Sequence, residues 1–529
     1  MPLTGRMDGP VYRLLRNGLL LVSVIVSAGC NGRRDSETAS RPFDGQHVKV
    51  AFPAGAGFQQ TLRPVLDEWT AQTGADGLLF PYVLKLADRL PAQLFGRSDG
   101  QLTPGEPAVV ILPLTCLSEL SADGLLLPIP RSRLSAEHLN WLDFLGGLRE
   151  RAASMGGRPT AIPLSCPVLV CYYRADLLEK SGLSLPRTWE EYQHLQQTLD
   201  EWAPGMTTVE PWNVDWRATM YLARAVSYAA HPGNYSLFFD IISGQPLIET
   251  PGFLRALEES QHSLARMPAD VKQYTPADCR REFLAGRAAM AITVEPGSFD
   301  GSFSFGPGWT PGPGRTPSPG RTDPGARSPV RDTSRTAARQ TSIRVTVARL
   351  PGCIKVFNRT SGTWESPRDR LLNRPTLVFG GLVAGVVGTG EAIPAAWNLL
   401  ETMTGDQLAK AFSPTTLSPC RMSQMTDTRT QIAAGLKGAE QQRTVAVVAE
   451  SLRNPRLIVE LPIVARERFR TALTAGLSRA LDGSSGAAES LATVAAKWQA
   501  LSKQMGNDQV VDSYRRALGL SPRRKPRLP

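Results

Sequence analysis

One stretch in the middle of the chain, residues 161–197, constrains the fold more than any other. Its run of β-branched and aromatic residues, Val168–Tyr173, predicts a strand. A short helix should follow and end at Gly182, because glycine readily adopts the left-handed conformation found after helices. Thr188 and Glu191 then have the spacing of a capping box, in which each side chain binds the backbone amide of the other. The stretch therefore predicts a strand, a short helix and a second, capped helix.

The segment that begins at Val48 also has an α/β pattern. Val48–Phe52 predicts a first strand, and a glycine-rich turn with Gly55 and Gly57 follows it. Phe58 then begins a segment whose apolar residues recur on one face of a helix. Ligands of such folds lie beyond the carboxyl ends of the strands. The Gly-x-Gly pattern is too short for a dinucleotide fingerprint, and a tight turn is the simpler interpretation.

The net charge of +11 is concentrated in three segments rather than spread over a folded face. Residues 1–29, 306–350 and 515–529 carry net charges of +2, +6 and +6, which leaves the rest of the chain close to neutral. A nucleic-acid groove is therefore not expected. Residues 301–341 contain almost no aliphatic side chains, so we expect a disordered basic insert there, inert or binding an anionic surface.

The N-terminus has the pattern of an export signal. Arg13 and Arg16 precede a short apolar run, and small residues lead to Cys30. Small residues ending in Gly-Cys resemble the lipobox of bacterial lipoproteins, which implies a lipid on Cys30 and a membrane-anchored protein of the periplasm or cell surface. The six other cysteines form no Cys-x-x-Cys or Cys/His cluster, so buried thiols are expected and a metal site is not.

Several motifs in order resemble family 1 extracellular solute-binding proteins of ABC transporters, the maltose-binding-protein-like group. Within the central stretch they are Ile162-Pro163, the segment 172–177 (YYRADL) and the segment 182–191 (GLSLPRTWEE). Further matches to the family pattern extend the resemblance over about 48–501. They are the segments 117–129, 279–297, 350–352, 376–386 and 417–421.

The resemblance implies two α/β lobes joined by a multi-strand hinge, with a ligand cleft between them and no enzymatic activity or cofactor. The predicted segments are a signal peptide over 1–29, a tether over 30–45, the first lobe over 46–163, the second lobe over 164–370 with the insert, a return to the first lobe over 371–421, C-terminal helices of the second lobe over 422–514, and a disordered basic tail over 515–529.

The resemblance and local chemistry together give a set of candidate ligand contacts. They are Gly55, Gly57, Phe58, Pro113, Thr115, Ser165, Trp212, Asn213, Trp216, Glu295, Gly380 and Gly381. Indole rings beside hydrogen-bonding side chains suit a sugar, because rings cover C–H faces while polar groups bind hydroxyls. The Trp cluster is equally consistent with a core under a loop, and Glu295 with an ordinary loop carboxylate.

Two functions follow from the resemblance. In the first, a monomeric, lipid-anchored protein captures a small solute, with a sugar or oligosaccharide as first choice, and delivers it to an ABC transporter permease. In the second, an envelope lipoprotein keeps the fold but has a structural or interaction role. The customary Asp at the start of one strand is Ala108 here, which together with the long insert favours the second function slightly.

Overall fold

The computed structural model describes residues 41–54, 58–83, 90–95, 105–137, 139–296, 343–366, 372–405, 418–426, 436 and 438–523. The predicted signal peptide, Cys30, Gly55, Gly57 and the predicted insert lie outside these residues. Within the described ranges, no helix combines the length and apolar character needed to cross a membrane.

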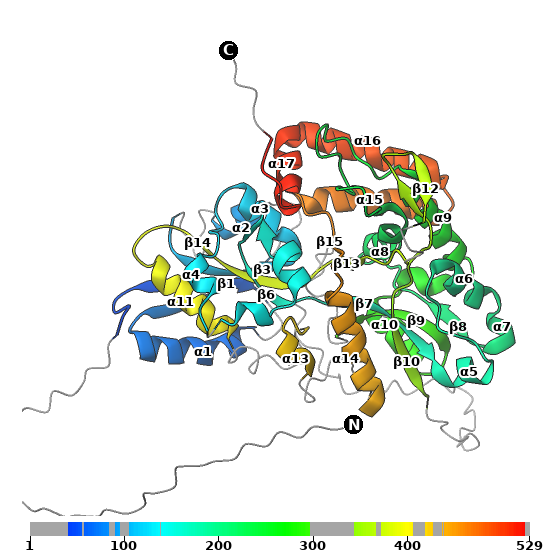
Figure 1. Ribbon diagram of the computed structural model, residues 1–529, viewed down its shortest axis with the longest axis horizontal. Helices are drawn as coiled ribbons and strands as arrows, with labels where there is room; N and C mark the ends of the chain where they lie inside the picture. Colours follow the sequence, from blue (N-terminus) through cyan, green and yellow to red (C-terminus); the bar gives the residue numbers. More distant parts are fainter. Residues whose placement is uncertain are drawn as a thin grey trace, which may run out of the picture. The chain divides into compact units, whose positions relative to one another are not determined.

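The first lobe is built on a five-stranded mixed sheet (Figure 1). Its strands, in order across the sheet, are β2 (Asp76–Tyr82), β1 (His47–Pro53), β3 (Ala108–Pro113), β14 (Leu382–Val387) and β6 (Ile162–Ser165). The first three are parallel, whereas β14 runs antiparallel to both β3 and β6. Helices α1 (Phe58–Thr73) and α11 (Ile393–Thr404) pack on this sheet. The apolar face predicted for α1 is confirmed, since its members are buried.

The second lobe is built on a four-stranded sheet that contains the strand predicted in the central stretch. Its strands, in order, are β10 (Val345–Arg349), β7 (Val168–Arg174), β9 (Ala288–Glu295) and β8 (Thr207–Val209). Every residue of β7 is buried, as expected for an apolar strand between two neighbours. Helices α10 (Pro276–Leu284) and α14 (Gly438–Leu452) pack against this sheet.

A group of helices completes the second lobe. They are α8 (Arg217–Ala229), α9 (Pro251–Leu264), α15 (Arg466–Leu481), α16 (Ala487–Met505) and α17 (Asn507–Ala517). The buried Trp498 of α16 stacks on Phe239, with ring centroids 5.3 Å apart. Helix α17 continues past residue 515, where the sequence analysis placed the start of the tail, because Tyr514 is buried and Arg515 donates a hydrogen bond to the Ile241 carbonyl.

Shorter elements connect these layers. They are α2 (Leu90–Leu94), η1 (Leu114–Cys116), α3 (Leu117–Ala122), α4 (Arg131–Leu134), η2 (Trp141–Asp143), η3 (Leu148–Ala152), β4 (Ser154–Met155), β5 (Arg158–Pro159), α5 (Ala175–Lys180), α6 (Trp189–Gln197), α7 (Leu199–Trp202), η4 (Ala269–Gln273), β11 (Val356–Asn358), β12 (Thr363–Glu365), β13 (Thr376–Val378), α13 (Met422–Thr426) and β15 (Leu457–Val459).

The capping box predicted at the start of α6 is confirmed. Glu191 N–H donates to the Thr188 hydroxyl at 3.1 Å, and the Glu191 carboxylate accepts from Thr188 N–H at 3.2 Å.

The chain leaves the first sheet for the second where β6 gives way to β7, and it returns to the first sheet where β13, a strand of neither sheet, gives way to β14. Segment 376–386 resembles the single strand by which the family returns to the first lobe. It is instead two strands in different sheets, because β13 pairs with β15 and β14 joins the first sheet. Gly381 separates them with a φ of +107°, and a Cβ there would lie 2.1 Å from the Ser165 carbonyl oxygen. Only glycine satisfies both requirements.

We therefore expect Gly381→Ala to lower the free energy of unfolding by about 2 kcal/mol or more, because it adds backbone strain and a contact with main chain that cannot move aside. Urea denaturation measures the loss. Gly146→Ala is the matched control, since Gly146 has ordinary φ and its added Cβ would meet only an arginine side chain at 3.7 Å. Equal stability of the two variants would contradict this account of the crossing.

Candidate ligand-binding site

The candidate residues of the first lobe gather at one edge of its sheet. Pro113 ends β3 and Ser165 ends β6, and both stand opposite Leu382, the first residue of β14. The Gly381 carbonyl accepts the amide of Leu114 at 3.0 Å, next to the buried Thr115. Gly380 precedes this contact directly in the sequence. Phe58 opens α1 and is buried. The structure thus brings Pro113, Thr115, Ser165 and Gly381 together.

The candidate residues of the second lobe follow two adjacent strands of its sheet. Glu295 ends β9 opposite Val168, where β7 starts after the crossing. Trp212, Asn213 and Trp216 lie in the loop between β8 and α8. The ring of Trp216 meets Phe379 of the second crossing edge-on, with centroids 5.5 Å apart. The loop after β8 therefore contacts the segment that leads to Gly380 and Gly381.

Three of the candidate side chains form polar contacts inside the second lobe. Trp212 is buried, and its indole N–H donates to the Glu210 carboxylate at 3.0 Å. Glu295 is buried too, accepting from Arg280 at 2.7 Å and from the Tyr172 hydroxyl. Asn213 is half-buried and its side-chain oxygen accepts the Trp216 amide at 3.1 Å. Their contact with a ligand stays a prediction.

A buried ion pair that the sequence analysis missed underlies the Trp212 loop. Arg224, in the middle of α8, donates to Glu210 at 3.0 and 3.2 Å and to the Ser260 hydroxyl at 3.0 Å. Its guanidinium also lies over the Trp189 ring, 4.3 Å from the centroid. Burial disfavours the charged form of Arg224, but Glu210, Glu259 and Tyr192 together outweigh this and raise the pKa of the guanidinium. A lone arginine within an apolar helix was the available signal.

A second buried carboxylate, Glu460, sits where β15 leads into α15. It accepts from Arg466 at 2.7 Å, from Arg470 at 3.1 Å and from the Thr219 hydroxyl at 3.0 Å. The segment after it has two non-glycine residues with positive φ, Leu461 and Ala465. Such backbone conformations cost energy and often mark functional segments.

This strained segment contacts the first lobe. The amide of Ala465 donates to Glu119 of α3 at 2.8 Å, and the other carboxylate oxygen of Glu119 accepts the Leu90 amide at 2.9 Å. A first-lobe carboxylate therefore faces the N-terminus of α15, where the helix dipole favours negative charge. This hydrogen bond links the two lobes next to Glu460 and its arginine partners.

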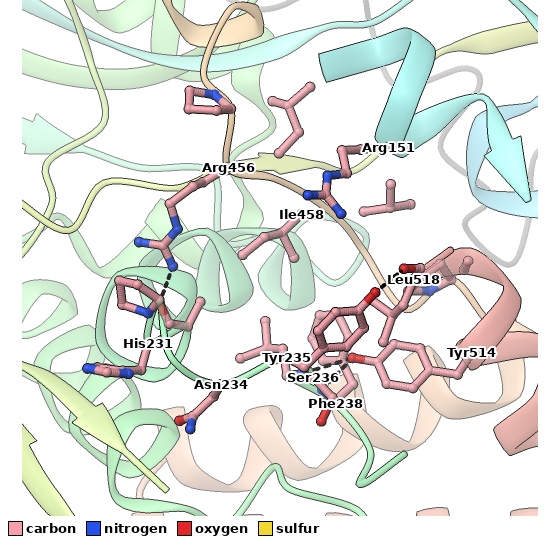
Figure 2. Close-up of a pocket in the computed structure, with 18 residues that line it drawn as sticks. Arg151, His231, Asn234, Tyr235, Ser236, Phe238, Arg456, Ile458, Tyr514 and Leu518 are labelled. Carbon is pink, nitrogen blue, oxygen red and sulfur yellow. Dashed lines mark hydrogen bonds between the residues drawn. The ribbon is translucent and has the colours of Figure 1, made fainter. Parts of the chain in front are cut away.

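A cavity of about 200 Å³ also borders the region where the lobes meet, beside β15 (Figure 2). Its walls come from η3, from the segment that follows α8, from β15 and its flanks, and from α17. None of the described candidate residues lines it. No motif marked it in the sequence, because four segments far apart in the chain assemble it.

The six described cysteines are free thiols, and all but the half-buried Cys116 are buried. Burial raises the pKa of Cys166 and of Cys171 to about 12. The expectation of buried thiols is confirmed for these positions.

Comparison with known proteins places the fold. No known family profile matches the sequence. Maltose-bound MalE3 of T. maritima is 18% identical, with 86% of this chain and 100% of that one covered at a TM-score of 0.56. An ABC transporter solute-binding protein of Agrobacterium radiobacter K84 in complex with ribitol is 18% identical, with coverages of 87% and 100% and a TM-score of 0.56. The sugar-binding protein MalE of Xanthomonas citri is 14% identical, with coverages of 86% and 98% and a TM-score of 0.60.

At these identities the similarity shows the fold alone. The chain has the mixed α/β fold of periplasmic solute-binding proteins over most of its length, which confirms the fold class predicted from the sequence. Of these three proteins, the first is bound to maltose, the second is in complex with ribitol, and the third is a sugar-binding protein.

We expect Glu210→Gln to lower the free energy of unfolding by about 3–5 kcal/mol, because it leaves the buried Arg224 charge without its carboxylate. Chemical denaturation followed by tryptophan fluorescence measures the loss. Glu201→Gln is the control, since this substitution removes the same charge at an exposed position of α7. A loss below about 1 kcal/mol is the range measured for exposed ion pairs, and it would show that Arg224 does not need Glu210 to stay folded inside the protein.

Proposed function

We propose that the chain is a lipid-anchored extracytoplasmic solute-binding protein, which captures a small solute by lobe closure and delivers it to an ABC transporter permease. The observation that carries this proposal is the match to solved binding proteins along their whole length, at 98–100% coverage of the three chains described above. Hinge closure of two lobes around a ligand is the motion that such a fold permits. Lipidation of Cys30 would hold the protein at the membrane.

A sugar or oligosaccharide is the proposed solute. Two of the neighbouring structures hold maltose and ribitol respectively, and both molecules carry many hydroxyl groups. Candidate residues of each lobe lie at the ends of the strands that adjoin the crossings, where a ligand of such a fold binds. Glycines 380 and 381 at this edge let a ligand approach the backbone closely.

A second candidate function is a structural role in the cell envelope. The observation that favours it is the pairing of both Trp212 and Glu295 inside the second lobe, with Glu210 and with Arg280 and Tyr172 respectively. Side chains that already have buried partners offer less to a solute. In this alternative the fold persists while solute capture has been lost.

A thermal-shift screen of the purified protein separates the two functions. The panel contains maltose, longer oligosaccharides, ribitol, mannitol, amino acids, polyamines and oxyanions. A bound sugar at a hundred times its Kd should stabilise the folded state by about 2.7 kcal/mol and raise the Tm. A response to amino acids or polyamines alone would reject the sugar, and no response from any compound would favour the structural role.

If a sugar binds, we expect Trp212→Ala and Glu295→Ala to weaken its binding by about tenfold or more, because each removes a ring or an acceptor from the proposed contact. Isothermal titration calorimetry of variants with native circular dichroism measures this. Trp202→Ala is the matched control, because it deletes another buried indole of the same lobe that is no candidate contact. Unchanged affinity in both test variants would remove these residues from the site.

A further inference from the structure

The cavity beside β15 has walls from both lobes and does not use the candidate residues of the proposed cleft. Arg151 extends from η3, and Arg456 and Ile458 come from β15 and the residue just before it. Tyr235 and Phe238 follow α8, and α17 supplies the remaining wall. Figure 2 shows the two arginines on either side of Ile458, with the aromatic side chains gathered in the lower half of the view. At about 200 Å³ the cavity has room for roughly six waters.

The charged groups lining the cavity are cationic. Arg151 and Arg456 line it, and the described lining contains no Asp or Glu. Arg456 is half-buried and donates only to neutral acceptors in the described structure, the side-chain oxygen of Asn373 and the Ala230 carbonyl. Burial lowers the pKa of Arg456, since these neutral partners do not compensate its charge. A half-buried guanidinium in this setting favours an anion nearby.

The third basic side chain of the lining, His231, already has partners. Its Nδ1 accepts the Gly233 amide at 3.0 Å, and its Nε2 lies 3.2 Å from a carboxylate oxygen of Glu365. The imidazole therefore has protein partners at both nitrogens. The charge that the cavity offers to a ligand comes from the two arginines.

Tyr514 adds a hydrogen-bond donor that the described protein does not use. Its oxygen accepts the amides of Leu237 at 2.9 Å and Phe238 at 3.1 Å, and the side chain is buried. No described residue accepts the hydrogen of this hydroxyl. Tyr235, by contrast, donates its hydroxyl hydrogen to the Leu518 carbonyl at 2.7 Å. A buried O–H without an acceptor is costly, so a ligand oxygen at this place would be stabilising.

The rest of the lining is largely apolar. Its members include Leu237, Phe238, Ile458, Val459 and Leu518. A ligand that fits this cavity therefore combines a negatively charged group with carbon that the apolar wall removes from water.

We propose that this cavity binds a small organic carboxylate. Arg151 and Arg456 supply the positive charge, Tyr514 donates a hydrogen bond, and the apolar side chains cover the carbon atoms. Phosphate sites commonly use successive backbone amides, but the amides of Leu237 and Phe238 already donate to Tyr514. Guanidinium groups bind carboxylates well without such amides.

Calorimetric titration of the full chain with benzoate, phenylacetate and hexanoate tests the proposal. Benzamide is the matched neutral ligand, because it has the shape of benzoate without the charge. We expect at least one carboxylate to bind and benzamide to bind at least about tenfold more weakly. Equal binding of benzoate and benzamide, or no binding of any of the three carboxylates, would overturn the proposal.

Arg151→Gln is the decisive variant, because Arg151 is exposed and forms no hydrogen bond or ion pair with another described side chain, so the fold should be unaffected. We expect it to weaken carboxylate binding by about tenfold. Arg158→Gln removes an exposed arginine of β5 outside the cavity lining and should leave binding unchanged. Equal effects of the two variants would indicate general charge attraction and would contradict the site.

Tyr514→Phe tests the donor separately. It removes the hydroxyl while keeping the ring, so carboxylate binding should fall by several-fold even where the Tm shows that the protein remains folded. Unchanged binding in both Arg151→Gln and Tyr514→Phe would place the carboxylate elsewhere. Any sugar found in the thermal-shift screen should bind Arg151→Gln as it binds the unmodified chain, which keeps this test independent of the proposed cleft.

Discussion

The buried carboxylate of Glu460 holds together the region through which the chain passes between its lobes. It accepts from two arginines of α15 and from Thr219 of α8, while its backbone amide donates to the Val378 carbonyl of β13. Two guanidinium groups in a buried site are stable only beside an acid. Arg466 also pairs with Glu467, but Glu460 is the acid that Arg466 and Arg470 share, so it links α15 to α8 and β13 beside the contact with Glu119 of the first lobe.

Much of the fold was predictable because local patterns and tertiary packing agree. The apolar run that became β7 is buried over its whole length, and Thr188 and Glu191 form their capping box as expected. The division of segment 376–386 was not predictable. An apolar run gives no sign of which sheet each half will join, and the reason for the break at Gly381 is a contact with Ser165, more than 200 residues earlier in the chain.

The candidate site divides in a similar way. The placement of Pro113, Ser165 and Glu295 at strand ends could be predicted, while their contact with a ligand stays a prediction. The partners of Trp212 and Glu295 could not, since Glu210 is hidden among ordinary acidic residues and Arg280 lies on a separate helix. The cavity beside β15 has no sequence signal at all, because its arginines and tyrosines meet only in the folded chain.

The buried free thiols can report how often different parts of the molecule unfold locally. A thiol reacts as its thiolate, and burial raises the pKa of Cys166, at the first crossing, and of Cys171, within β7, to about 12. Each can be alkylated at neutral pH only while its surroundings are open to water. The alkylation rate of Cys166 thus reflects how often the segment between β6 and β7 unfolds locally. The rate of Cys171 reflects how often the second-lobe sheet does so. The unmodified protein therefore carries its own probes for comparing how often these two places unfold locally.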